Sequence, residues 1–484
     1  AADGFEPERG LKFSTYAVPV ILGEMKRLFR DGGTVKVSRS LKELSLKALR
    51  EKERLSVELG REPRLDELAA RGVRFDRAFT CQPVCGPARS ALQTGLYPTQ
   101  TGCFVNGIAL PPDVPTLAEA FHRGGYATAY VGKWHLASTD GVDDFQTAPI
   151  PPERRGGWRD YWVASDVLEF TSDGYGGHMF RADGSRYEFR KYRADGVTDA
   201  ALEYLRGPRD RAQPFFLFLS HIEPHHQNNH HRYEGPEGSR ERFAAYDVPP
   251  DLAGTGGNWR ENYPDYLGAC SACDENLGRL LDELERTGEL ENTVVVFASD
   301  HGSHFCTRNK EYKRSCHDGC THIPLVIAGP GFSGGRACER VVSLLDLPRT
   351  LLACAGLAPI AGMQGRDLRI AADGGPWEDV AFLQISESHV GRAIRTPRWT
   401  YEVGAVGKDG WKDPGAQEYM EVFLYDNEND PAQKRNLVAR PDLAPLRAHL
   451  RALLRREMAR AGEKNPRIVP FADNGYLEAI SAPL

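Results

Sequence analysis

The sequence predicts an α/β protein: a three-layer α/β/α sandwich around a mostly parallel sheet, with a small C-terminal α+β subdomain and a helical N-terminal extension. Three apolar runs of strand length, each followed by polar residues, support this prediction: 126–131, 214–220 and 293–299. Segments of helical pattern lie between them, as parallel strands require. With 484 residues, 49 glycines and 32 prolines, the chain is long enough for two or three loop-rich domains.

The overall charge and hydropathy exclude several classes of partner. The 61 basic and 67 acidic residues leave a formal net charge of −6, so neither nucleic acid nor a membrane is an expected partner. No apolar run reaches the roughly 18 residues of a membrane span, and the N-terminus has no hydrophobic signal core. We therefore expect a cytoplasmic protein from the sequence as given, or a periplasmic one if its true N-terminus differs.

The first part of the chain, residues 10–68, is predicted to be helical with a break at residues 31–33. Residues 11–55 carry 11 Lys and Arg against 5 Asp and Glu, an excess that is typical of a solvated helical face. Three short segments in this part resemble bacterial sigma factors of the sporulation and stress type: FSTYA, GEMKR and VSRSLKEL. Since the resemblance covers only a fragment of such a factor, it does not predict binding to DNA or RNA polymerase.

The stretch CGPARSALQTG, which begins at Cys85, combines a nucleophilic side chain, a rigid turn and an arginine. Gly86 and Pro87 bend the chain, and residues 88–93 predict a helix that ends at Gly95. Cys85 is then expected at a helix N-terminus, where backbone N–H groups and the helix dipole favour an anion. Without further signals, such a cysteine is most often a small buried residue.

The same stretch resembles the sulfatase signature, Cys-x-Pro-x-Arg followed by Thr-Gly, at Cys85, Pro87, Arg89, Thr94 and Gly95. The resemblance implies that a formylglycine-generating enzyme oxidises Cys85 to formylglycine and that Arg89 holds the hydrate of this aldehyde. A hydrate suits sulfate transfer because one hydroxyl attacks sulfur and the other lets the carbonyl re-form and expel sulfate. A plain alcohol would remain esterified.

Lys133 and His135 follow the strand expected at 126–131, in the phrase GKWHL. Functional groups in open α/β sheets lie just past the carboxyl ends of strands, and the two-residue period of a strand sends both side chains to the same side. By itself, either residue is typical of a protein surface. The phrase matches a sulfatase motif, which implies that Lys133 binds sulfate and that His135 transfers a proton.

The strand expected at 214–220, which we predict to be central in the sheet, continues into a histidine-rich loop. The sulfatase resemblance implies a histidine here that binds sulfate and transfers a proton, and His225 is our choice. His221 and His226 are the alternatives. Since two more histidines follow closely, the loop is also compatible with a transition-metal site or a solvated segment.

The strand expected at 293–299 ends in Asp300 and His301. An acidic residue in this place often only caps a turn. The resemblance implies that Asp300, His301 and the modified Cys85 bind a divalent cation, calcium, with magnesium or manganese as alternatives, since an oxygen-rich site suits a hard cation. Further on, Lys313 has the spacing of the family's sulfate-binding lysine, and Lys310 is the alternative.

The sequence departs from the sulfatase pattern at the start. Sulfatases open with a strand that ends in paired aspartates, two of the metal ligands. The aspartates before Cys85 are single and none follows an apolar strand; they are Asp3, Asp31, Asp66 and Asp76. The sequence therefore predicts a sulfatase fold with an incomplete set of metal ligands.

The resemblance extends from about residue 65 to the C-terminus, and we place domains at 1–69 (sigma-like), 70–375 (catalytic) and 376–484 (sheet-and-helix subdomain). It implies a sulfuric ester hydrolase that acts on a sulfate monoester of a small molecule or saccharide. Three alternatives stay open. The first is a phosphonate or phosphate-ester hydrolase of the same alkaline-phosphatase-like superfamily. The second is a protein with the sulfatase fold but without activity, and the third is a regulatory protein that acts through its sigma-like segment.

Overall fold

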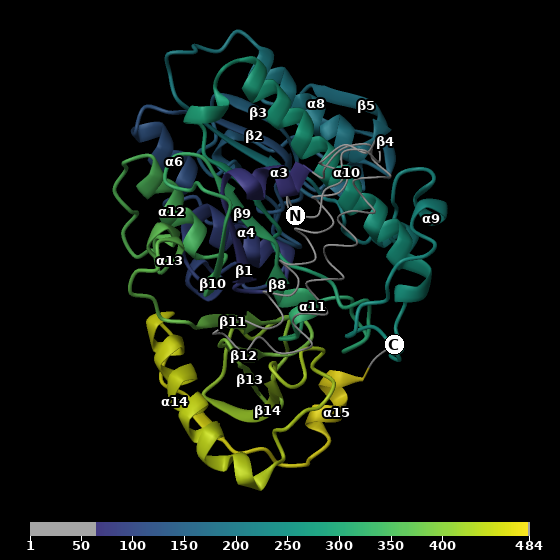
Figure 1. Ribbon diagram of the computed structural model, residues 1–484, viewed down its shortest axis with the longest axis vertical. Helices are drawn as coiled ribbons and strands as arrows, with labels where there is room; N and C mark the ends of the chain where they lie inside the picture. Colours follow the sequence, from purple (N-terminus) through teal and green to yellow (C-terminus); the bar gives the residue numbers. More distant parts are fainter. Residues whose placement is uncertain (1–63, 483–484) are drawn as a thin grey trace, which may run out of the picture. The chain divides into compact units, whose positions relative to one another are not determined.

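The computed structural model describes residues 64–482. The helices expected over residues 10–63 lie outside them. The predicted α/β class is confirmed: helices cover both faces of β-sheet structure (Figure 1). The helices are α3 (Arg64–Arg71), α4 (Cys85–Thr94), α5 (Pro98–Thr101), α6 (Leu117–Arg123), α7 (Leu168–Thr171), α8 (Arg193–Arg206), α9 (Ser239–Arg242), α10 (Trp259–Arg286), α11 (Asp318–Thr321), α12 (Asp346–Cys354), α13 (Leu368–Ala372), α14 (Ala444–Arg460) and α15 (Tyr476–Ser481).

Within residues 64–482, the strands of the sandwich form two mixed sheets. The first has the order β10–β1–β9–β7, with β8 beside the end of β1. These strands are β1 (Val73–Phe79), β7 (Val295–Ala298), β8 (His322–Ile323), β9 (Leu325–Ala328) and β10 (Arg336–Ser343). β1 and β10 are parallel, whereas β9 is antiparallel to both β1 and β7.

The second sheet has the order β5–β4–β3–β2–β6. Its strands are β2 (Ala127–Lys133), β3 (Tyr161–Ser165), β4 (Tyr175–Arg181), β5 (Arg186–Tyr192) and β6 (Phe215–Ser220). β2 is parallel to both β3 and β6, as the apolar runs predict for buried strands. The run 214–220 was expected at the centre of a sheet. Among the described residues, however, β6 pairs only with β2 and lies at an edge.

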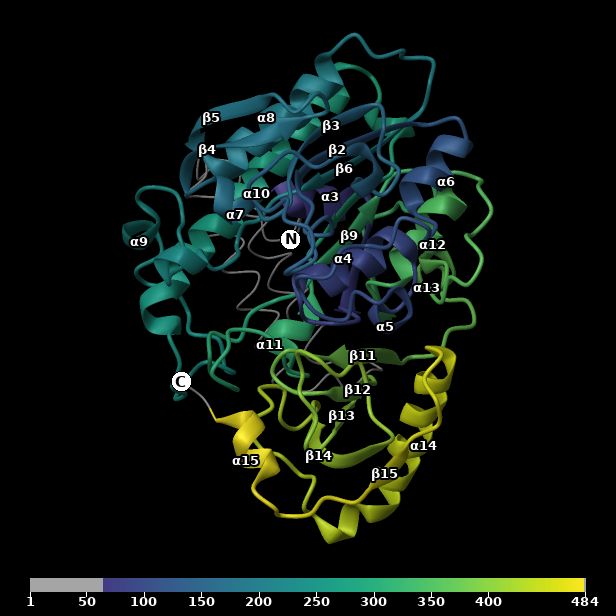
Figure 2. The same cartoon turned by 180° about the vertical axis from the view of Figure 1, so that it is seen from behind.

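A third sheet lies beside the sandwich and is covered by α14 (Figures 1 and 2). Its order is β11–β12–β13–β14–β15, antiparallel except for the last pair. These strands are β11 (Ala381–Ile385), β12 (Gly391–Arg395), β13 (Trp399–Gly404), β14 (Glu418–Asp426) and β15 (Arg467–Val469). The domain boundaries placed after residues 69 and 375 stay predictions.

Two groups of helices form the outer layers of the sandwich. Apolar residues of α3, α8 and α10 pack in one core cluster with β6 and β7. On the other side, α4, α12 and α13 pack in a second cluster with β1, β9 and β10. The helix predicted at 88–93 is confirmed as part of α4. None of the helices within 64–482 is long and apolar enough to cross a membrane.

An aromatic cluster fills the space beside β2. The ring of Tyr130 stacks on Trp162 and on Phe218 of β6, with centroids 5.3 Å apart in both pairs. Trp134 and Trp158 contact the same tyrosine ring edge-on at 5.0 and 5.2 Å. This cluster fixes β2 and β6 against each other directly behind Lys133.

Candidate active site

Cys85 is the first residue of α4, as predicted, and its side chain is buried. Gly95 ends the helix with a φ of 72°, a left-handed conformation that favours glycine. The Sγ of Cys85 lies 3.0 Å from the Nζ of Lys313 and 3.1 Å from the Nε2 of His301. Lys133 approaches the same sulfur, with its Nζ at 4.0 Å. The structure thus gathers around Cys85 three groups that are separate in the sequence.

The surroundings of Cys85 favour negative charge. Burial by itself raises the pKa of the thiol, but the ammonium groups of Lys133 and Lys313, together with nearby imidazoles, outweigh it and hold this pKa well below its usual value. Both ammonium groups are themselves buried, with 1% of each lysine exposed. An anion at residue 85 therefore meets fixed positive charges that solvent does not screen.

Arg89, one turn further along α4, ties together the ends of three strands. Its Nη1 donates to the carbonyl of Lys133 at 2.9 Å and to the Oγ of Ser220 at 2.6 Å. Its Nη2 lies 3.2 Å from a carboxylate oxygen of Asp300. In this arrangement Arg89 positions β2, β6 and the chain after β7; its expected contact with an aldehyde hydrate stays a prediction.

Glu169, in α7, belongs to the site although sequence reasoning missed it. Its Oε2 lies 3.6 Å from the Nζ of Lys133 and 3.4 Å from the Nδ1 of His225. Burial raises the pKa of this carboxyl, but Lys133 and His225 outweigh burial and bring the pKa down to about 2. The segment around Glu169 has no motif or regular pattern in the sequence, so only the folded chain brings it to Lys133.

His225 faces the site, and the two alternatives do not. Its Nε2 lies 3.4 Å from the Nζ of Lys313 and 3.1 Å from the hydroxyl of Tyr312. Burial lowers the pKa of His225 to about 4, so the ring is neutral near pH 7. His221 instead contacts the hydroxyl of Thr198 at 2.8 Å, and His226 stacks on the ring of Tyr312.

His135 lies outside the contacts of Cys85 that the structure describes. β2 ends at Lys133, and His135 has a φ of 60°, so the alternation of a strand does not extend to it. Lys133 and His135 were predicted to point to the same side because both were expected to follow the alternation of one strand. The strand ends before His135, so this argument does not apply. The Nδ1 of His135 is buried and has no hydrogen-bond partner among residues 64–482. Its role in proton transfer stays a prediction.

Lys313, rather than Lys310, reaches the site. Lys313 is buried against Cys85 and His301, with its Nζ 3.3 Å from the Nε2 of His301, whereas Lys310 is exposed. The chain after β7 brings Lys313 back to the carboxyl end of that strand. This contact could not be deduced from the apolar pattern and was expected only from the family spacing.

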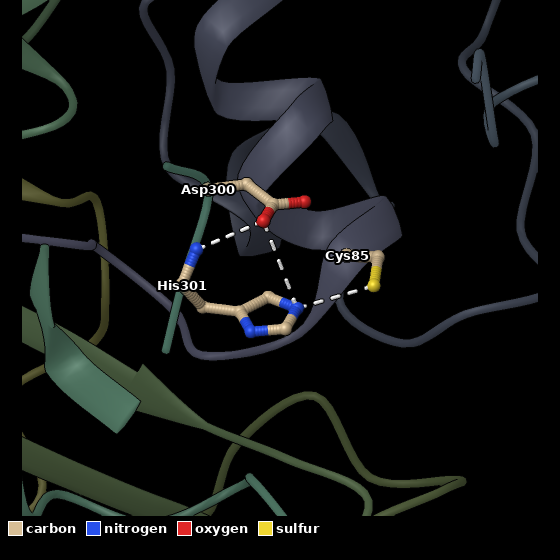
Figure 3. A group of neighbouring side chains, drawn as sticks. All are labelled: Cys85, Asp300 and His301. Carbon is tan, nitrogen blue, oxygen red and sulfur yellow. Dashed lines mark hydrogen bonds and ion pairs between the residues drawn. The ribbon is translucent and has the colours of Figure 1, made fainter. Parts of the chain in front are cut away.

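Asp300 and His301 follow β7 and form a cluster with Cys85 (Figure 3). One ligand atom from each of the three lies within 4.8 Å of the other two. The donors are one carboxylate, one imidazole and one sulfur, and Asp300 already pairs with Arg89. Calcium takes six to eight oxygen ligands. This cluster does not supply that set.

Comparison with known proteins agrees with this geometry. Residues 57–357 match the family model for sulfatases. The chain belongs to the sulfatase family. It is 30% identical over 418 residues to the ulvan-active sulfatase of Formosa agariphila, a match that covers 83% of this chain and 77% of that protein. The chain is accordingly a sulfuric ester hydrolase by family, and sulfatases generally use formylglycine and a metal ion.

Solved structures give the same fold. The yidJ protein of Bacteroides fragilis is 25% identical, covers 83% of this chain and 90% of its own, and has a TM-score of 0.71. BT4656, solved with its substrate D-glucosamine-2-N,6-O-disulfate, has a TM-score of 0.65 at 22% identity, with 83% and 93% of the two chains covered. A phosphonate monoester hydrolase of Silicibacter pomeroyi has a TM-score of 0.59 at 20% identity, with 82% and 90% covered.

The family match also bears on the sigma-like segment. Since the match begins at residue 57, residues 57–68 fall within the sulfatase family rather than outside it. Leu65 and Leu68 of α3 pack in the core cluster of β6 and β7, as residues of the same folded unit do. The predicted resemblance of residues 10–68 to a sigma factor is therefore not supported.

Proposed function

We propose that this sulfatase hydrolyses sulfate monoesters of saccharides through a formylglycine formed from Cys85. The observation that supports the proposal most strongly is the pair of buried ammonium groups, from Lys133 and Lys313, within 4.0 Å of the Cys85 sulfur. Two relatives support the saccharide as substrate: one is named as active on ulvan, and the other was solved with a glucosamine disulfate. A formylglycine-generating enzyme is the partner that the modification requires.

The residues of the chain divide the work on a sulfate ester. Lys133 and Lys313 bind sulfate oxygens and offset the negative charge that develops on them in the transition state. Glu169 holds Lys133 in place, with its Oε2 3.6 Å from the lysine Nζ. Formylglycine, once installed, supplies the nucleophile and a route to release sulfate without a stable ester.

His225 is suited to move the proton of the leaving alcohol. Its ring is neutral near pH 7, and its Nδ1 lies beside Glu169. Its Nε2 lies 3.4 Å from the Nζ of Lys313, which in turn contacts the sulfur of Cys85. A ring in this position accepts a proton from the nucleophile and returns it to the alcohol oxygen as the ester bond breaks. Calcium, or magnesium or manganese in its place, stays the predicted cofactor, although the described cluster alone does not complete its site.

The test is hydrolysis of p-nitrophenyl sulfate by the chain co-expressed with a formylglycine-generating enzyme, with and without added calcium. Cys85→Ala is the control, and mass spectrometry reports the aldehyde at residue 85. We expect turnover that Cys85→Ala abolishes. Full conversion of Cys85 without turnover on any sulfate ester would refute the proposal and support the alternative of an inactive sulfatase fold.

The structural likeness to a phosphonate monoester hydrolase keeps one second candidate open. Both reactions need a nucleophile and fixed positive charge around a tetrahedral anion, so the lysines do not distinguish them. The ratio of kcat/KM for p-nitrophenyl sulfate to that for p-nitrophenyl phenylphosphonate decides between them. We expect the sulfate ester to be preferred.

A further inference from the structure

Tyr312 lies against His225 in the candidate active site. Its hydroxyl oxygen is 3.1 Å from the Nε2 of His225, and the two rings meet edge-on with their centroids 5.6 Å apart. The Nζ of Lys313, the next residue along the chain, lies 5.1 Å from the centre of the tyrosine ring. Tyr312 therefore contacts two of the residues to which the proposed function assigns a role.

The contacts of His225 define which of its ring nitrogens carries the proton. Nδ1 lies 2.6 Å from the carbonyl oxygen of His226 and 3.4 Å from the Oε2 of Glu169, and both of these oxygens only accept hydrogen bonds. Nδ1 therefore carries the proton of the neutral ring, and Nε2 has a lone pair. The hydroxyl of Tyr312 donates to this lone pair. Tyr312 thus contacts the nitrogen that takes up a proton in the reaction.

Asn228 gives the hydroxyl of Tyr312 a second acceptor. The Nδ2 of Asn228 donates to the Oε1 of Glu169 at 2.6 Å, and its Oδ1 lies 3.5 Å from the Tyr312 oxygen. A hydroxyl both donates and accepts, and its proton rotates to suit its partners. Tyr312 can therefore donate to the Nε2 of a neutral His225 ring. When that nitrogen is protonated, Tyr312 can accept from it and donate to Asn228 instead.

The ring of Tyr312 is fixed although its hydroxyl proton is free to rotate. The ring of His226 stacks on it with centroids 5.1 Å apart, and Tyr233 meets it edge-on at 6.5 Å. The carbonyl of Tyr312 accepts from the N–H of His304 at 2.8 Å and from the Oγ of Ser303 at 3.0 Å. Burial raises the pKa of the Tyr312 hydroxyl well above its usual value, so the group keeps its proton near pH 7.

We propose that Tyr312 positions His225 for proton transfer and exchanges its hydrogen bonds as His225 gains and loses a proton. As the attacking oxygen bonds to sulfur, its proton passes to the Nε2 of His225, and the Tyr312 hydroxyl turns from Nε2 to Asn228. When the ester S–O bond breaks, the proton passes from Nε2 to the alcohol oxygen, and the hydroxyl turns back. Tyr312 itself gains and loses no proton. This inference rests on the proposed function, because it requires proton transfer by His225.

The test compares two substrates that differ in their need for a proton on the leaving oxygen. The nitro group of p-nitrophenyl sulfate stabilises the departing phenolate, whereas phenyl sulfate has no such group. Tyr312→Phe keeps the ring and removes the hydroxyl. It should lower kcat/KM about tenfold more for phenyl sulfate than for p-nitrophenyl sulfate. Tyr233→Phe is the matched control and should leave this ratio unchanged, because the hydroxyl of Tyr233 contacts Ser303 instead of His225.

A second variant shows whether Tyr312 acts through the histidine. In the background of His225→Ala, Tyr312→Phe should change kcat/KM by less than about twofold, because the two residues act as one unit. An equal loss for both substrates in Tyr312→Phe would overturn the proposal and assign Tyr312 a structural role. A further tenfold loss in the absence of the His225 ring would overturn it as well.

A signal that does not depend on turnover distinguishes this proposal from the proposed function. NMR spectra of the full chain with isotope-labelled histidine, assigned with His225→Ala, should show an unprotonated Nε2 in His225 near pH 7. The resonance of this nitrogen should shift in Tyr312→Phe and stay in place in Tyr233→Phe. An unchanged resonance in Tyr312→Phe would refute the role of Tyr312 even if sulfate esters are hydrolysed. The expected shift in a protein that hydrolyses no sulfate ester would refute the proposed function and retain the hydrogen bond between Tyr312 and His225.

Discussion

β2 and β9 differ from β6 and β7 in burial, although all four strands are mainly apolar. Every residue of β9 is buried, and so is every residue of β2 after its first. By contrast, β6 is half-buried up to its last residue, and β7 is half-buried with an exposed end. Within residues 64–482, the first two strands have neighbours on both edges, and the second two have one neighbour each. Position in the sheet, rather than composition, therefore decides how much of an apolar strand leaves water.

The largest expected effect tests this comparison by truncating matched leucines. Leu325→Ala in β9 should lower the free energy of unfolding by about 2–5 kcal/mol, because it leaves a cavity in a closed core. Leu217→Ala in β6 should cost less than half as much, since part of the side chain is already exposed. Urea denaturation of both variants measures the difference. Equal losses would show that β6 is as enclosed as β9.

The comparison extends to the two lysines of the site. Lys133 ends β2, which has two neighbouring strands, and Lys313 follows β7, which has one neighbour among the described residues. Removing either ammonium group, by Lys133→Ala or Lys313→Ala, should lower kcat/KM for p-nitrophenyl sulfate by about 10²–10³-fold. The exposed Lys310→Ala is the control and should stay near wild type. A much smaller loss for Lys313→Ala than for Lys133→Ala would show that the segment after β7 does not hold the Lys313 ammonium group in place.

Glu169 contacts residues from the ends of two strands, Lys133 at the end of β2 and His225 after β6. The native pKa of its carboxyl, about 2, lies below its ordinary value of 4.5. The carboxylate therefore stabilises the fold above pH 4.5, and this contribution is lost as the pH falls toward 2. The linkage is worth about 3 kcal/mol.

Comparison with Glu169→Gln isolates this contribution. Between pH 5 and pH 2, the free energy of unfolding should fall by about 3 kcal/mol more in the wild type than in the variant. Guanidinium titrations at each pH measure it. Parallel curves for the two proteins would contradict the assigned pKa.

The smallest expected effect compares two alanines of paired strands, Ala328 in β9 and Ala298 in β7. Ala328 is buried and Ala298 is exposed. Ala328→Ser should cost about 1–3 kcal/mol by burying a hydroxyl that lacks a partner, whereas Ala298→Ser should stay within about 0.5 kcal/mol. Thermal unfolding of both variants measures this difference. A large cost for Ala298→Ser would mean that this end of β7 is covered in solution.

Much of the fold was predictable because local patterns specify it. The apolar runs gave β2, β6 and β7, and the Gly-Pro turn with its terminal glycine gave α4 and the place of Cys85. The pairing of these strands was not predictable in the same way. Whether β6 lies at the centre or at an edge depends on contacts with distant strands, which a run of apolar residues does not encode.

The candidate site was predictable only where a motif exists. Cys85, Lys133 and Asp300 lie in short sequence motifs of the family, and the structure brings them to the same region. No family motif surrounds Glu169. The direction of the His135 side chain was predicted from the alternation of a strand, which its left-handed backbone breaks. In both cases the position of the side chain depends on the path of the backbone between helices and strands, which a local sequence pattern does not predict.

The aromatic cluster beside β2 has a practical consequence. Three of the seven tryptophans of the chain, Trp134, Trp158 and Trp162, are buried around Tyr130, which stacks on Phe218 of β6. Their ultraviolet emission thus reports on the packing against β6. Any event that shifts β6 should change the colour or yield of this emission, which gives the protein an intrinsic optical signal that needs no attached dye.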